Sequence, residues 1–381
     1  MNIQHEIIVI GGNHPNTLGL IRSIGENGLP VTLMLEPCST LEFCSLRFSK
    51  YIAKMYLLQS KEEILEILNR DFAAESEKPV ILCASDSAIS LLDAHYDELK
   101  ERFLFFNAGE QGRINHFMDK ANMLQLADEC GLTTIKTWHL NSQSEIPSDI
   151  TYPCFVKASN SAVDGKAGIG LCESREELAE KLQLGHEFLV QEYVEKEYEL
   201  DINGISIRHG EEVMIPAVCR KIRDYEERQS DYIVLEDVQQ YSHVDLESVK
   251  RLIAAIGYEG LFSVEFLCRG NKAYFLEINM RNDGVNYLYT SSGVNTPMRW
   301  VNYCSGKFEN FDKGFCKTPL YLMQQADISN VLHHHISLTT WLKDLMRTRA
   351  FFVLNWRDPK PFLYTLWMNL ILVLRKLHII K

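Results

Sequence analysis

Short apolar runs, separated by a helical pattern and polar loops, mark the first part of the chain. An apolar run at residues 7–10 leads through a glycine-containing loop and a helical pattern to a second run, Val31–Leu35. This strand–loop–helix–strand order predicts a βαβ unit with parallel strands. Two further buried strands are predicted at residues 78–86 and 103–108. We therefore expect residues 1–112 to form a small, open α/β domain.

A helix and a lysine-bearing strand are predicted next. Residues 118–132, MDKANMLQLADECGL, have helical periodicity, and Gly131 is placed to end the helix. Residues 152–159, YPCFVKAS, form an apolar strand pattern that contains Lys157. A lysine inside a buried strand needs a partner charge. The glycine-containing segment 159–171 is either a phosphate-binding loop, which would use its backbone N–H groups, or a simple hairpin turn.

The pattern then changes to longer strands that carry charged residues. Residues Tyr198–Ile207 are expected to begin a second sheet, with Glu197 and Asp201 as candidates for solvent-facing positions. Within VCRKIRDYEERQ, the cations Arg220, Lys221 and Arg223 lie close together in sequence. Such a run is either a solvated sheet edge or a binding site for an anionic substrate.

Alternating apolar and polar residues from 261 to 283 predict a β-hairpin whose turn contains Gly270. Because side chains alternate between the two faces of a strand, Glu277 and Asn279 project from the same face. Glu265 can project toward them from the neighbouring strand. Oxygen ligands on rigid backbone suit Mg²⁺, which usually takes one or two carboxylates and completes its shell with phosphates and water.

Composition narrows the classes of function. The 381 residues, 46% hydrophobic and 24% charged, are typical of a globular protein with two or three subdomains. A net charge of -12 argues against general nucleic-acid binding, which favours a basic face. The cysteines are scattered singly, and the first residues lack a signal-peptide pattern, so we expect a reducing, cytoplasmic location. Cys83 and Cys154 are expected in the core.

The last forty residues differ from the rest. From Trp341 to Lys381 there are eight lysines and arginines and two aspartates, a net charge of +6, so the remainder carries -18. The apolar run at residues 361–374 is shorter than the roughly 20 residues that span a bilayer. Its cationic flanks and aromatic residues fit a helix lying at the inner face of a membrane. The alternative is packing against the enzyme's own acidic body or a second subunit of a homodimer.

Taken together, these features resemble the ATP-grasp superfamily of carboxylate–amine ligases over about residues 5–300. The resemblance is carried by the leading βαβ unit, the Asp119–Lys120 pair, CFVKAS, the glycine-containing segment, QEYV with EYELD, and SVEF with FLEINMR. It implies an N-terminal open parallel α/β domain, a two-subdomain ATP-grasp fold and a helical C-terminal extension. The corresponding ranges are 1–112, 113–192 (linker helix and lid), 193–310 (metal and catalytic subdomain) and 311–381.

The resemblance also implies the nucleotide-binding residues. Lys120 and Lys157 would contact the phosphates of ATP. A mobile loop containing Gly165, Gly168 and Gly170 would close over them. The connector residues Glu192, Tyr193 and Val194 would meet the adenine. Glu197 would hold the ribose, with Glu199 as the alternative because the connector lacks its usual length and glycine.

The same resemblance implies metal ligands and a reaction. Glu265, Glu277 and Asn279 would bind two Mg²⁺ ions, with Mn²⁺ as the alternative metal. ATP would convert a carboxylate into an acyl phosphate, an amine would attack it, and ADP and phosphate would leave. Arg281 and Arg223 would hold the carboxylate because a guanidinium fork suits planar oxyanions, with Lys221 as a third candidate.

The substrates are expected to be a small carboxylate and an amine, both resembling amino acids. Residues 281–301 are similar to ligases that join an amino acid to another carboxylate, such as the D-aspartate ligase group. Two alternatives stay open. One is carbamoyl-phosphate-synthase-like or carboxylase chemistry on bicarbonate. The other is a catalytically silent nucleotide-binding scaffold.

Overall fold

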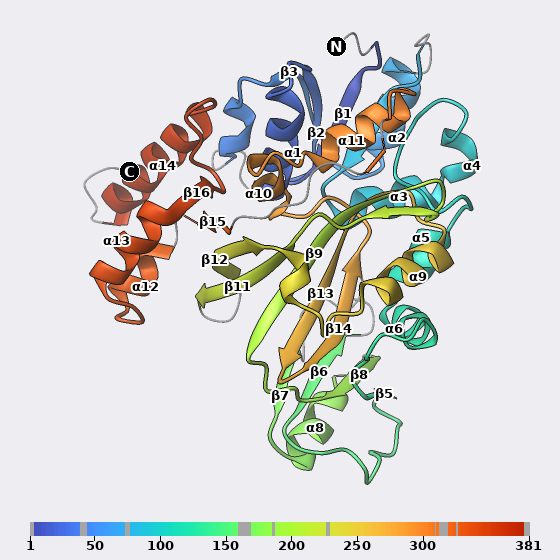
Figure 1. Ribbon diagram of the computed structural model, residues 1–381. Helices are drawn as coiled ribbons and strands as arrows, with labels where there is room; N and C mark the ends of the chain where they lie inside the picture. The colour runs from blue at the N-terminus through green and yellow to red at the C-terminus, as the bar shows by residue number, and fades with distance from the viewer. Residues whose placement is uncertain are drawn as a thin grey trace.

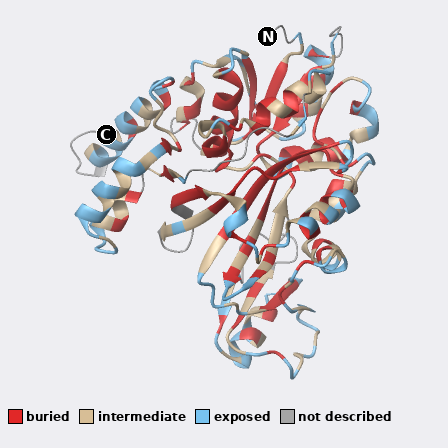
Figure 2. Ribbon diagram, in the orientation of Figure 1, coloured by how far each residue is buried: buried red, intermediate tan, exposed pale blue. Residues whose placement is uncertain are grey.

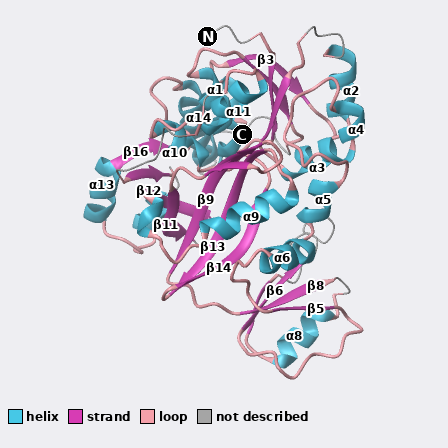
Figure 3. Cartoon of the chain, turned by 45° about the vertical axis from the view of Figure 1, so that its right-hand side comes forward, coloured by secondary structure: helices cyan, strands magenta, loops and turns pink. Residues whose placement is uncertain are grey.

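The computed structural model describes most of the chain and arranges it in three sheets (Figure 1). The described residues are 4–38, 44–72, 77–158, 169–184, 187–225, 229–308, 310–311, 319–324 and 327–376. In the turned view of Figure 3, the large sheet lies between the N-terminal sheet at one end and a small sheet at the other.

The N-terminal sheet is parallel, with the strand order β3-β2-β1-β4. Its strands are β1 (Ile7–Gly11), β2 (Val31–Leu35), β3 (Ile52–Leu57) and β4 (Val80–Cys83). Its helices are α1 (Pro15–Gly25), the 3-10 helix η2 (Ser45–Phe48), α2 (Glu63–Asp71), α3 (Asp86–Ala94) and α4 (Tyr96–Leu99). The βαβ prediction is confirmed. Strands β1, β2 and β4 are buried throughout, which explains their continuous apolar runs.

Two strand assignments within the first domain need correction. Residues 103–108 are not a strand; they make single bridges, Leu104 to Val80 and Asn107 to Glu259. Their apolar character reflects burial of side chains such as Phe106 rather than strand pairing. The edge strand β3 was not predicted, because half-buried and exposed residues interrupt its apolar pattern.

The small sheet is antiparallel, with the order β5-β8-β6-β7, and is covered by helix α8. Its elements are β5 (Thr137–Leu140), β6 (Cys154–Ala158), β7 (Gly170–Cys172), α8 (Arg175–Leu182) and β8 (Phe188–Glu192). Helices α5 (Arg113–Met118) and α6 (Lys120–Glu129) precede it. Gly131, in the left-handed conformation, follows the end of α6 as predicted. Cys83 and Cys154 are fully buried, as expected.

The large sheet runs β14-β13-β9-β11-β12-β15-β16, with β10 paired to β9. Its strands are β9 (Tyr198–Ile207), β10 (Glu212–Met214), β11 (Val218–Tyr225), β12 (Gln229–Glu236), β13 (Gly260–Arg269), β14 (Lys272–Asn279), β15 (Leu320–Met323) and β16 (Thr348–Phe351). The helical elements around it are η3 (Val238–Gln240), α9 (Leu246–Ile256), α10 (Asn286–Ser291) and α11 (Thr296–Cys304). The predicted hairpin is β13–β14, and Gly270 adopts a positive φ of 56° at its turn.

The C-terminal region contains helices α12 (Ile328–Leu332), α13 (Leu338–Arg347) and α14 (Lys360–Lys376). It is not only helical as predicted, because β15 and β16 extend the large sheet. A fully buried ion pair, Arg22 Nε to Asp358 Oδ2 at 3.1 Å, ties this region to α1. Within the described residues, the structure contains no helix that is both long and apolar enough to cross a bilayer.

Candidate active site

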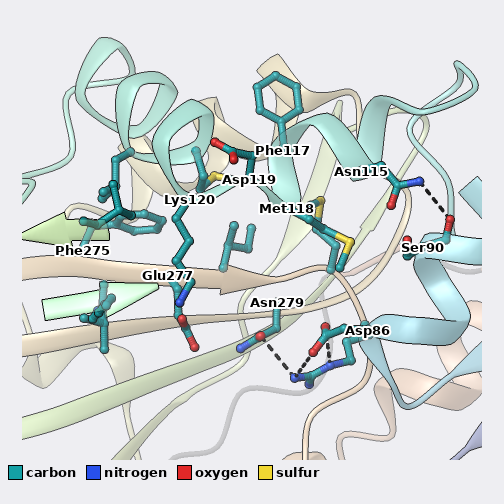
Figure 4. Close-up of a pocket in the computed structure, with 18 of the residues that line it drawn as sticks. Asp86, Ser90, Asn115, Phe117, Met118, Asp119, Lys120, Phe275, Glu277 and Asn279 are labelled. Carbon is teal, nitrogen blue, oxygen red and sulfur yellow. Dashed lines mark hydrogen bonds and ion pairs between the residues drawn. The ribbon is translucent and has the colours of Figure 1, made fainter. Parts of the chain in front are cut away.

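A cavity of about 580 Å³ lies where β14, the starts of α3 and α6, and strands β6 and β8 of the small sheet meet (Figure 4). Five residues singled out from the sequence line it: Lys120, Lys157, Glu277, Asn279 and Arg281. They come from segments separated by up to 161 positions, so only the tertiary fold brings them together. The apolar part of the wall includes Met118, Met123, Leu124, Leu189 and Phe275.

Lys120 is positioned by the beginning of α6. Asp119 is the N-cap of this helix and accepts hydrogen bonds from the backbone N–H groups of Ala121, at 3.0 Å, and Asn122, at 3.1 Å. This cap fixes the point at which the helix starts, and Lys120 is its first residue. Figure 4 shows the side chain of Lys120 extending toward the carboxylate of Glu277.

Lys157 projects from β6 of the small sheet into the same cavity. Burial lowers its pKa, the nearby Glu277 raises it, and Lys120 lowers it further. The partner charge that the sequence required is therefore supplied from the large sheet. Two lysines and one carboxylate at a single cavity wall form a site suited to an anion with a bound divalent cation.

The predicted metal ligands lie on paired strands. Glu265 of β13 is directly opposite Glu277 of β14, and Glu265 also faces Asp201 of β9. Asn279, two residues beyond Glu277, donates from Nδ2 to Ser263 Oγ at 3.2 Å. Glu265 itself is not among the residues that line the cavity. A row of carboxylates thus crosses three neighbouring strands and ends at the cavity.

Asp201 corrects the sequence interpretation. It was expected to face solvent, but it is only 4% exposed on a strand, β9, that lies between β13 and β11. Burial and the nearby carboxylates of Asp283 and Glu265 raise its pKa. A single strand's alternation cannot reveal whether its second face is covered, so this residue was missed.

Lys221 lies at the centre of this acidic group. Its Nζ is 2.7 Å from Glu199 Oε2 and 3.4 Å from Glu265 Oε2. Burial disfavours the charged amine, but Glu265 and Glu199 outweigh that effect and raise its pKa. Lys221 therefore holds carboxylates together rather than facing the cavity. The charge run that contains it is not a solvated edge, because β11 is an interior strand.

Arg281 joins the large sheet to the N-terminal sheet. Its Nε donates to Asp86 Oδ1 at 2.8 Å and its Nη2 to Asn279 Oδ1 at 3.2 Å, bonds marked in Figure 4. Asp86 is the first residue of α3, directly after β4. Nearby carboxylates, including Asp86 and Asp283, raise the pKa of Arg281 although its burial acts in the opposite direction. The guanidinium is thereby held at the cavity wall by groups from two domains.

Arg223 lies elsewhere. It donates to Asp327 from Nε at 2.8 Å and from Nη2 at 2.7 Å, and its Nη1 donates to Asp344 at 3.0 Å. These contacts bind β11 to the C-terminal region. The structure does not bring Arg223 to the cavity, and its predicted contact with a carboxylate substrate has no support from this arrangement.

The connector residues lie outside the cavity lining as well. Glu192 ends β8, Tyr193 is exposed, and Val194 follows it. Glu197 accepts a hydrogen bond from the Gly270 N–H at 3.1 Å, at the hairpin turn. With Glu199 engaged by Lys221, the choice between Glu197 and Glu199 as ribose ligand stays a prediction.

The predicted phosphate-covering loop is described only in part. Gly170 begins β7 with φ 143°, which favours glycine. Gly165 and Gly168 lie outside the described residues.

The donor set fits magnesium. Glu265, Glu277 and Asn279 can offer oxygen ligands, which Mg²⁺ prefers. Their two carboxylates match the one or two carboxylates through which proteins usually bind this ion. Among the described residues, no three histidine, cysteine or acidic side chains cluster closely enough to form a complete metal site.

Comparisons with known sequences find a family match for the part of the chain that contains β6, β8 and the β13–β14 hairpin. Residues 125–293 match the model of the ATP-grasp domain. Formate-dependent phosphoribosylglycinamide formyltransferase of a Nitratiruptor species is 24% identical over 239 residues, 59% of this chain and 57% of that protein. The carbamoyl phosphate synthase large chain of Clostridium beijerinckii is 25% identical over 253 residues, 62% of this chain and 22% of that protein. This chain spans less than two thirds of the length of either relative.

Solved structures support the same fold. The L-amino acid ligase from Bacillus licheniformis superposes with a TM-score of 0.63 at 14% identity, covering 82% of this chain and 78% of that one. At this identity the likeness concerns the fold alone. The predicted order of an open parallel N-terminal α/β part followed by an ATP-grasp fold is confirmed.

Proposed function

Because this chain is an ATP-grasp protein, we propose that it uses ATP to convert a carboxylate into an acyl phosphate, which an amine attacks to form an amide bond. ADP and phosphate are the other products. The observation that carries this proposal is the cavity in which Lys120, Lys157, Glu277 and Asn279 meet Arg281. Cations for phosphates, oxygen ligands for a metal and a guanidinium for a carboxylate lie at one wall.

In this proposal the protein supplies positioning and charge rather than covalent chemistry. Lys120 and Lys157 hold the phosphates, and the small sheet serves as the lid. Arg281, fixed by Asp86 and Asn279, orients the carboxylate and stabilises the negative charge of the acyl phosphate. Glu265, Glu277 and Asn279 would hold Mg²⁺, which would neutralise charge on the transferring phosphoryl group. Lys221 positions Glu265.

The relatives favour the same kind of reaction. By their names, one relative depends on formate, and the solved ligase acts on L-amino acids. Both fit a reaction in which a carboxylate is the activated group. The carbamoyl phosphate synthase relative favours a second candidate, activation of bicarbonate. The silent-scaffold alternative is disfavoured, because a chain without catalysis has no need to keep these charged groups together in a half-buried site.

The experiment that tests the proposal is ADP release by the full chain with Mg²⁺ and ATP, measured across amino acids, small carboxylates and bicarbonate. We expect release to require one carboxylate and to rise with one amine. Hydroxylamine, which converts acyl phosphates into hydroxamates, should trap the activated carboxylate. Release stimulated by bicarbonate alone would favour the second candidate. Absence of ADP release with every combination would favour the scaffold.

Substituting Lys157 with methionine is expected to weaken ATP binding by roughly 10- to 100-fold, the value of a charged hydrogen bond of about 1.5–3 kcal/mol. Methionine keeps most of the length of the side chain and removes its charge. Isothermal titration with Mg²⁺ and a non-hydrolysable ATP analogue measures the change. Lys250→Met on the exposed side of α9 is the matched control, since Lys250 pairs only with its helix neighbour Glu247. Equal affinities for both variants would refute the assignment.

A further inference from the structure

The outer face of α14 is apolar and exposed. Leu363, Leu366, Trp367, Leu370 and Val373 are each between 50% and 57% exposed. Their spacing of three, one, three and three residues places them on one stripe of the 17-residue helix. Figure 2 shows exposed and half-buried residues predominating along the helix, at the end of the molecule near the C-terminus.

The opposite face of α14 packs against η2 of the N-terminal part of the chain. Tyr364 packs on Phe48 of η2, with ring centroids 4.3 Å apart, and accepts a hydrogen bond from Arg47 at 3.2 Å. Met368, one turn further along, is buried. The helix is therefore anchored to the N-terminal part of the chain, and the described residues leave its outer stripe uncovered.

A tryptophan extends this exposed surface. Trp356, in the turn just before α14, is 86% exposed, although tryptophan has the largest apolar side chain. Together with Trp367 it gives the surface two indole rings. Indole combines a large apolar ring with a polar N–H group, and tryptophan is enriched where a membrane meets water.

The charges around the stripe have one sign. Both acidic residues of the region face inward: Asp358 pairs with Arg22, and Asp344 pairs with Arg223. Basic residues flank the helix: Arg357, which pairs with the mostly buried Glu26 at 3.5 Å, and Lys360 lie at its start, and Arg375 lies near its end. The outward side of this region is therefore apolar and cationic, whereas the rest of the chain is acidic.

We propose that the surface formed by Trp356 and the outer stripe of α14 binds an anionic phospholipid bilayer, with the helix lying parallel to the membrane. An apolar stripe bordered by cations matches acyl chains below anionic headgroups. The acidic remainder of the chain is repelled from such a membrane, so this surface also sets the orientation. A second copy of the chain is disfavoured as the occupant, because it would bring two cationic surfaces together.

The test is co-sedimentation of the full chain with vesicles of phosphatidylcholine alone and of phosphatidylcholine with phosphatidylglycerol. We expect binding to the anionic vesicles only, and weaker binding as sodium chloride screens the charges. The double variant Leu366→Gln with Leu370→Gln should bind roughly tenfold more weakly because it removes apolar area from the stripe. Leu184→Gln is the matched control, since Leu184 is 52% exposed but follows α8 at the far end of the molecule.

Thermal melting and sedimentation velocity accompany the vesicle assay. The double variant should melt as the unaltered chain does, which separates loss of binding from loss of folding. No sedimentation with anionic vesicles, or equal binding by the double variant, would overturn the proposal. A dimer that the double variant converts to monomer would also overturn it, because the stripe would then contact a second copy. None of these readouts depends on the proposed ligase activity.

Discussion

Glu277→Gln is expected to lower substrate-stimulated ADP release roughly a thousandfold, the loss seen when a group that stabilises transition-state charge is removed. Glutamine has nearly the same volume but no negative charge. It would leave the cavity with Lys120 and Lys157 and weaken the set of oxygen ligands for Mg²⁺. Release of ADP at saturating Mg²⁺, ATP and substrates measures this effect.

The fold should not change in this variant, since Glu277 is a cavity residue rather than a core residue. The thermal melting curve without ligand checks this point. Glu247→Gln is the control, because Glu247 is 72% exposed and pairs with Lys250 on the surface of α9. Unchanged turnover in Glu277→Gln would show that the metal assignment is wrong. A large loss in the control would mean that activity responds to surface charge in general.

Arg22→Met is expected to lower the free energy of unfolding by about 3–5 kcal/mol, because it leaves a buried carboxylate without its ion-pair partner. Arg22 and Asp358 are both fully buried, and Asp358 would retain only the hydroxyl of Ser49, at 2.8 Å, and the backbone N–H of Lys50, at 3.0 Å. Arg22 also donates to the carbonyl of Val353 at 2.8 Å. Urea denaturation at neutral pH measures the loss.

An exposed ion pair provides the contrast. Arg70→Met removes the pair between Arg70, 65% exposed, and Asp71, and should leave the free energy of unfolding nearly unchanged because solvent screens the exposed charges. The double variant Arg22→Met with Asp358→Asn should recover part of the stability, since no unpaired charge remains buried. Equal small losses in Arg22→Met and Arg70→Met would show that the C-terminal region is not held by the buried pair.

Substitution of Arg22 also bears on the membrane proposal. Asp358 stands two residues before α14, so its ion pair helps to set where the helix meets the N-terminal domain. The vesicle assay should therefore use variants of the outer stripe rather than of Arg22.

The local pattern of apolar and polar residues was sufficient to predict a strand where the surroundings of that strand are the same along its length. The buried parallel strands β1, β2 and β4 produce continuous apolar runs, and the β13–β14 hairpin shows alternation around Gly270. The pattern failed at β3, whose edge position leaves it partly exposed, and at residues 103–108, where burial occurs without strand pairing. The hydrophobic pattern indicates which residues are buried. It indicates only indirectly which backbone groups pair in a sheet.

The sequence by itself determined the fold class, the hairpin, and the residues Lys120, Lys157, Glu277 and Asn279 that now share one cavity, because each has a local pattern or motif. Only the tertiary structure decided which charges meet. In the folded chain Asp201 is buried, and Lys221 pairs with carboxylates on β9 and β13. Arg223 pairs with Asp327 and Asp344. The tertiary structure also set Arg281 against Asp86, 195 residues away. Such pairings depend on strand order and domain packing, which distant segments establish together.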